Sequence, residues 1–201
     1  MYPDDLNLGS THTHLRKEKP SAMRKVLYLL NELSERDLDW MLTNGSRQQV
    51  KAGTILIKEG EPTDALYIVV EGSLTVSIAA LGGREISTIG GGEVLGEMSF
   101  VDDRPPAATV KAVEDALVLA VPRKELSEKL QKDVLFALRF YRAITKFLST
   151  RLRGAVNWLS DDKDVLNSQV SSQEPFESTD DMTLASARFE KLVKRLNEKE
   201  G

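Results

Sequence analysis

The stretch between residues 47 and 121 constrains the fold most, because its apolar residues recur at every second position. The alternation is clearest in two triplets: Leu74, Val76 and Ile78, and then Leu117, Leu119 and Val121. A period of two is typical of a strand with one buried face and one exposed face. Glycines separate the apolar runs at short intervals. Short strands that turns interrupt in this way predict a mainly β fold, a compact antiparallel sandwich or roll.

Helical periods precede this stretch. From Ser21 onwards a crowded apolar face predicts an amphipathic helix. The residues of that face are Val26, Leu27, Leu29, Leu30 and Leu33. A second helix is expected to begin at Ser34, because Asp37 stands three residues later and completes a capping-box pattern. Gly45 is expected to end this helix in a left-handed conformation, which costs glycine little.

Residues 124–159 return to the helical period and predict a long C-terminal helix. From residue 134 onwards its apolar residues form two stripes, so one face can pack on the roll while the other needs a cover. A second copy of the same helix would cover it with heptad spacing, which favours a homodimer through residues 134–159. The alternative is a single wide apolar face that is buried within its own domain.

Composition divides the rest of the chain. Residues 1–20 are polar and hold two prolines, so they are expected to form a flexible arm before a domain over residues 21–159. Residues 160–181 are acidic and serine-rich, as in a linker. Residues 182–199 predict a short amphipathic helix, which is marginal alone in water. That helix must therefore dock on its own domain, on a dimer mate or on another protein.

Several functional classes are disfavoured by composition. The formal net charge of −4 gives no electrostatic case for binding nucleic acid, and no apolar run is long enough to span a membrane. No signal-peptide pattern opens the chain, so a cytoplasmic protein is expected. The chain has no cysteine, and its two histidines, His12 and His14, fall in the expected arm. We therefore predict no metal site and, without a histidine base in the core, no enzyme.

The segment from Gly96 to Val110 places Gly-Glu and Ala-Ala-Thr at the two ends of a turn-rich insert between apolar strands. It resembles the phosphate-binding cassette of the cyclic-nucleotide-binding domain family, which includes protein kinase A regulatory subunits and the catabolite-activator regulators. Residues 51–61 and 66–74 resemble the opening strands and the next hairpin of that family. The resemblance covers roughly residues 25–158 and implies an antiparallel β-roll of the jelly-roll kind, with N-terminal helices and a long C-terminal helix.

The resemblance implies a site for cyclic AMP or cyclic GMP, with no other cofactor. In it, Glu97 would accept a hydrogen bond from the ribose 2′-hydroxyl, and Gly96 would let the backbone come close. Backbone N–H groups around Met98, Ser99 and Ala107 would cradle the phosphate. The ligand-binding residues implied in this way are Gly96, Glu97, Met98, Ser99, Arg104, Pro106, Ala107, Ala108 and Thr109.

The family's arginine position, nine residues after Glu97, holds Pro106 in this chain. An arginine there would pair with the phosphate oxygens, whereas proline has neither charge nor N–H. Arg104 could replace it if the turn runs differently, or it could stay in solvent beside Asp102 and Asp103. Two hypotheses follow. One is a sensor that signals through its C-terminal helix, with Arg104 beside Glu97; the other is a ligand-free dimerisation or protein-interaction scaffold in which the prolines close the turn.

Overall fold

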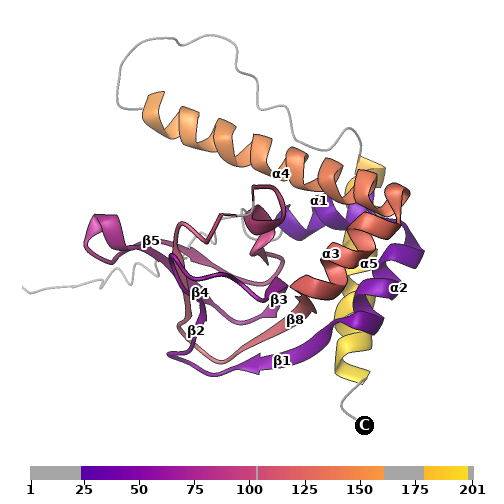
Figure 1. The fold of residues 1–201 in the computed structure, drawn as a ribbon, viewed down its shortest axis with the longest axis horizontal. Coiled ribbons are helices and arrows are strands. Elements are labelled where there is room, and N and C mark those ends of the chain that lie inside the picture. Colours follow the sequence, from indigo (N-terminus) through magenta and orange to yellow (C-terminus); the bar gives the residue numbers. More distant parts are fainter. Residues whose placement is uncertain (1–23, 103, 161–178, 199–201) are drawn as a thin grey trace, which may run out of the picture.

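The computed structural model describes residues 24–102, 104–160 and 179–198, and it contains two four-stranded antiparallel sheets flanked by helices (Figure 1). The first sheet has the order β1 (Ser46–Val50), β8 (Ala116–Pro122), β3 (Ala65–Glu71) and β6 (Val94–Leu95). The second has the order β2 (Ile55–Ile57), β7 (Thr109–Ala112), β4 (Leu74–Ile78) and β5 (Arg84–Ile89). Two short 3₁₀ helices interrupt the strands, η1 (Ala79–Leu81) and η2 (Glu97–Phe100). The mainly β fold predicted from the period of two is confirmed.

Strand β8 separates the two halves of the hydrophobic core. Its residues Leu117, Leu119 and Val121 belong to the cluster that includes the helices. The residues between them, Ala116, Val118 and Ala120, belong to the cluster between the two sheets. The expected alternation of buried and exposed residues is therefore wrong for this strand, because helices cover the face that would otherwise meet water. Strand β4 departs in a milder way, since Thr75 is buried while Ile78 is only half-buried.

The two N-terminal helices are α1 (Arg24–Glu32) and α2 (Glu35–Asn44). The predicted apolar face of α1 is buried, together with Leu33, which follows it. The capping box of α2 is confirmed, since the Ser34 backbone N–H donates to Asp37 Oδ2 over 2.8 Å and the Asp37 N–H donates to Ser34 Oγ over 3.3 Å. Two donors at the start of α2 are thereby satisfied.

Gly45 ends α2, but the left-handed conformation expected for it is wrong. Its φ of −87° and ψ of 159° are those of extended backbone. Glycine is needed here for space, because a Cβ would lie 2.6 Å from the carbonyl oxygen of Met41 and 2.7 Å from Leu119 Cδ1. The chain passes directly from α2 into β1 at this point, so close packing rather than a turn selects the residue.

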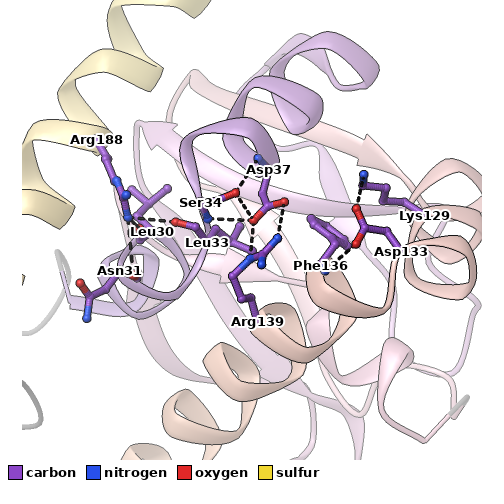
Figure 2. A network of polar contacts seen from close by, with 10 residues as sticks. All are labelled: Leu30, Asn31, Leu33, Ser34, Asp37, Lys129, Asp133, Phe136, Arg139 and Arg188. Atoms are coloured by element: carbon purple, nitrogen blue, oxygen red, sulfur yellow. Dashed lines mark hydrogen bonds and ion pairs between the residues drawn. The ribbon is translucent and has the colours of Figure 1, made fainter.

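The long helix expected over residues 124–159 is two helices, α3 (Arg123–Lys132) and α4 (Val134–Ser160). Asp133 separates them. Its backbone N–H donates to the Lys129 carbonyl, and its carboxylate Oδ1 accepts the N–H of Phe136 over 2.9 Å (Figure 2). An aspartate in that role caps the N-terminus of the following helix, which is why the apolar period alone did not reveal the break.

Helix α4 has one covered face and one exposed face. Phe136, Phe140, Ala143, Ile144 and Phe147 are buried, whereas Val134, Leu135, Leu138, Tyr141 and Leu152 are exposed. We call the second set the outer stripe. Figure 1 shows α4 running alongside α1 and extending well past it. In the single chain the outer stripe has no cover among the described residues.

The last helix, α5 (Thr179–Glu198), packs against α1 and α2 (Figure 1). Ala185, Leu192 and Leu196 are buried in that contact. The helix begins within the range that the sequence assigns to the linker, 160–181. The expected arm, residues 1–20, and residues 161–178 lie outside the described residues. None of the described helices is both long enough and apolar enough to cross a bilayer.

Candidate functional site

Gly96 turns the chain from strand β6 into the 3₁₀ helix η2. Its φ of +80° lies in the left-handed region, where a residue with a Cβ is strained. A Cβ at this position would also lie 2.7 Å from the carbonyl oxygen of Ala65. The neighbouring residue Leu95 pairs with Tyr67 on β3, which fixes the position of the turn. Glycine is therefore needed here for its close approach to strand β3, and the approach to a nucleotide that the resemblance implies for Gly96 stays a prediction.

The residues of η2 alternate between interior and solvent. Glu97 and Ser99 are 4% and 3% exposed, whereas Met98 between them is exposed. The Ser99 hydroxyl donates to the carbonyl of Arg104 over 3.5 Å, and the Ser99 carbonyl accepts from Arg123 Nη2 over 2.8 Å. Contacts to both sides therefore hold this turn, and Glu97 places a carboxylate at the base of the cassette.

Arg104 lies on the solvent side of the cassette. Its side chain is 83% exposed, and its Nε lies 3.8 Å from Asp102 Oδ2. The Arg104 backbone N–H donates to Asp102 Oδ1 over 3.2 Å. Of the two alternatives for this residue, the structure has the solvated loop residue paired with its acidic neighbour. The arginine and the buried Glu97 are thus not brought together.

The second end of the cassette is attached to the loop after β2. The Pro106 carbonyl accepts the N–H of Gly60 over 2.9 Å, and Thr109 Oγ1 accepts the N–H of Glu59 over 3.1 Å. Ala107 is exposed and Ala108 half-buried. The contribution of Pro106 is therefore a backbone oxygen that fixes the loop 58–61.

A cavity of about 300 Å³ lies in this loop, lined by residues 55–58 and 61–64. Thr63 connects it to the cassette, since Thr63 Oγ1 would lie 3.6 Å from a Cβ placed on Gly96. The Tyr67 hydroxyl donates to Asp64 at the cavity over 2.6 Å, and burial together with this bond raises the pKa of Tyr67. Sequence reasoning did not select Gly60 or Thr63. A signal for Gly60 was its place in the 51–61 stretch that resembles the family's opening strands, and its φ of +77° is one that glycine favours.

Aromatic rings join the cassette to the helices. Phe100, the last residue of η2, lies edge to face with Phe140 of α4, their ring centroids 6.1 Å apart. The Arg123 guanidinium lies 5.1 Å from the centroid of the Phe100 ring. Phe140 in turn stacks on Phe136 with centroids 6.1 Å apart, and Phe136 contacts Trp40 of α2. A displacement of η2 would therefore change the packing of Phe100 against the buried face of α4.

Comparison with known proteins identifies a family that this part of the chain resembles. Residues 47–133 match the family model described as a cyclic nucleotide-binding domain. The chain is 30% identical to the cyclic AMP receptor protein of Thermus thermophilus over 129 residues, which is 63% of this chain and 58% of that protein. It is also 30% identical to the cAMP-dependent protein kinase regulatory subunit of Yarrowia lipolytica over 127 residues, which is 63% of this chain and 33% of that protein.

Among solved structures, the N-terminal domain of a transcriptional regulator from Streptomyces coelicolor superposes with a TM-score of 0.52 at 29% identity. The match covers 65% of this chain and 94% of that domain. The two curated relatives are longer than the part that this chain matches, which is 58% of one and 33% of the other. The likeness therefore concerns one domain, with its two sheets and its cassette.

Proposed function

We propose, from the premise that residues 47–133 form a domain of the cyclic nucleotide-binding family, that this chain is a regulatory sensor for cyclic AMP or cyclic GMP. The observation that carries the proposal is the buried carboxylate of Glu97, presented by a tight turn directly after the left-handed Gly96. A carboxylate in a water-poor turn is suited to accept a hydrogen bond from a ribose hydroxyl. The two curated relatives are a cyclic AMP receptor protein and a cAMP-dependent protein kinase regulatory subunit, so cyclic AMP is the first ligand to test.

The phosphate would be bound by backbone rather than by arginine. Arg104 is exposed and paired with Asp102, and Pro106 offers no charge and no N–H. Backbone N–H groups of η2 and of Ala107 are then the donors left to the cassette. A hydrogen bond to a charged group contributes roughly 1.5–3 kcal/mol, so the missing arginine should weaken binding by about one to two decades.

Signalling would pass through the helices. Phe100 of η2 contacts Phe140 of α4, so ligand binding that shifts η2 favours one packing of α4 over another. The outer stripe of α4 would report that packing in a homodimer, because a second copy of the helix covers it. We expect wild-type protein to run as a dimer in light scattering and Leu138→Glu to run as a monomer. Leu81→Glu, which changes another exposed leucine on η1, is the control and should leave the dimer intact.

A second function is favoured by the position of Arg104. If the cassette holds no ligand, the same domain would serve as a protein-interaction scaffold whose helices do the binding. The solvent-exposed arginine and the bond between the Pro106 carbonyl and Gly60 are what this alternative requires. In neither case do we expect catalysis.

Isothermal titration with cyclic AMP and cyclic GMP separates the two functions. Glu97→Gln should weaken binding about ten- to hundredfold, because a charged acceptor is lost. Glu93→Gln is the matched control, since Glu93 is buried to the same degree and lies outside the cassette. Arg104→Ala should bind as the wild type does. Absence of heat at millimolar nucleotide, with the protein folded by circular dichroism, would contradict the sensor and leave the scaffold.

A further inference from the structure

Helix α1 packs against two partners, α4 on one side and α5 on another. Acidic residues of α1 and α2 meet basic residues in both contacts. From α4 the pairs are Arg139 with Asp37, and Arg142 and Lys146 with Glu32. From α5 the pairs are Arg188 and Lys191 with Glu35, and Arg195 with Asp39. The α1–α2 pair is therefore an acidic platform that α4 and α5 bind through basic side chains.

Arg188 makes the most buried of the α5 contacts. Its Nη1 donates to the carbonyls of Leu30 and Leu33 over 2.6 and 2.9 Å (Figure 2). Its Nε donates to Glu35 Oε1 over 3.0 Å. The carbonyls in the last turn of a helix have no partner within that helix, and a cation there is favoured by the helix dipole. A side chain of α5 thus completes the end of α1, although more than 150 residues separate them in sequence.

The turn between α1 and α2 joins the two contacts. Leu33, held by Arg188, is followed by Ser34, whose N–H and hydroxyl both donate to Asp37 Oδ2. The same carboxylate receives Arg139 Nε over 2.7 Å and Arg139 Nη2 over 3.0 Å. Figure 2 shows this row of contacts running from α5 through the turn to α4. A change at one end alters the geometry that the other end needs.

We propose that α5 is a releasable latch on the α1–α2 pair, and that its docking is coupled to the packing of α4 on the same pair. Most of the stability of a helix in a protein comes from the packing of its apolar face, so α5 depends on its docking to α1 and α2. Release would remove the cap from α1 and loosen the turn that positions Asp37 for Arg139. This inference needs no nucleotide and goes beyond the proposed sensor.

Hydrogen exchange followed by mass spectrometry on the full chain tests the latch. Strands β3 and β8 serve as the internal reference for global unfolding. In the wild type we expect amides of α5 to exchange faster than those of β3 and β8. Arg188→Gln should accelerate exchange in α5 roughly ten- to hundredfold, because charged hydrogen bonds are lost, and should also accelerate it in α4 over residues 139–146.

Lys194→Gln is the control, because Lys194 is exposed and pairs with Glu198 of the same helix. It should leave all exchange rates as in the wild type. Exchange of wild-type α5 as slow as that of β3 and β8 would overturn the latch and make α5 a fixed part of the core. Faster exchange in α5 with α4 unchanged would overturn the coupling. If Arg188→Gln does not fold, Lys191→Gln, which breaks a half-exposed pair with Glu35, takes its place.

Discussion

The cassette and the turn between α1 and α2 hold their charged groups in opposite ways. In the cassette, Arg104 pairs with an aspartate two residues away and faces solvent. At the α1–α2 turn, Asp37 is 3% exposed and pairs with Arg139, which lies 102 residues further along the chain. The cassette is shaped by backbone contacts, and the helical turn by long-range ion pairs. Arg104 of the cassette therefore has a local partner, whereas the charged residues of the helical turn hold neighbouring helices together.

The largest effect is expected from the backbone of the cassette. Gly96→Ala would place a Cβ in a left-handed conformation and against the Ala65 carbonyl. The conformation costs about 1–2 kcal/mol and overpacking about 1–3 kcal/mol, so we expect unfolding free energy to fall by about 3 kcal/mol in urea titrations.

Gly53→Ala separates the two contributions. Gly53 has a φ of +84°, and no atom lies within 4 Å of a Cβ placed on it. This variant should lose only the conformational part, about 1–2 kcal/mol. Equal losses in the two variants would mean that the approach to Ala65 does not constrain the cassette.

A smaller loss is expected at the helical turn. Asp37→Ala removes one half of the capping box of α2, the bond from the Ser34 N–H, and leaves Arg139 without its carboxylate. Because the Arg139 side chain is 30% exposed and can turn to water, we expect a loss of about 2 kcal/mol, below the full cost of breaking a buried pair. Asp39→Ala, which breaks an exposed pair with Arg195, should cost under about 1 kcal/mol by the same denaturation assay. Similar losses would show that burial does not distinguish these two pairs.

The smallest expected effect is a change in how the stability of the protein depends on pH. Burial raises the pKa of Asp37, but hydrogen bonds from Arg139 and Ser34 outweigh it, so the pKa is lowered from its usual 3.8. The stability from this carboxylate is complete above the unfolded pKa and is lost as the pH falls through the lower folded pKa. Thermal melts below pH 4 should therefore show a shallower loss for Asp37→Asn than for the wild type. Parallel curves would contradict the role of Asp37.

Local patterns in the sequence predicted several of the features described above. Ser34 and Asp37 three residues apart predicted the capping box, and the period of two predicted the roll. Features that depend on distant segments were not accessible. The need for glycine at position 45 depends partly on Leu119, and the burial of the second face of β8 depends on where the helices pack. The sequence does not choose between docking of α5 on its own domain, on a dimer mate or on another protein. An amphipathic period identifies the apolar face of a helix but not the surface that this face packs against.

The exposed position of Arg104 was one of two alternatives that sequence reasoning kept. The nearby Asp102 indicated the outcome, but the direction of a side chain on a turn depends on how that turn is held. Here Gly60 and Glu59 hold the far end through the Pro106 carbonyl and Thr109. No residue pattern in the cassette itself encodes those contacts.

The register of strand β8 is specified by the side chains on both of its faces. Its small and large residues alternate, with two alanines and a valine toward the sheets and two leucines and a valine toward the helices. A slip of one residue against β1 or β3 would exchange the two sets, crowding one half of the core and leaving voids in the other. Misaligned pairings of this strand are thus disfavoured by the packing on both of its faces, so the strand specifies a single register.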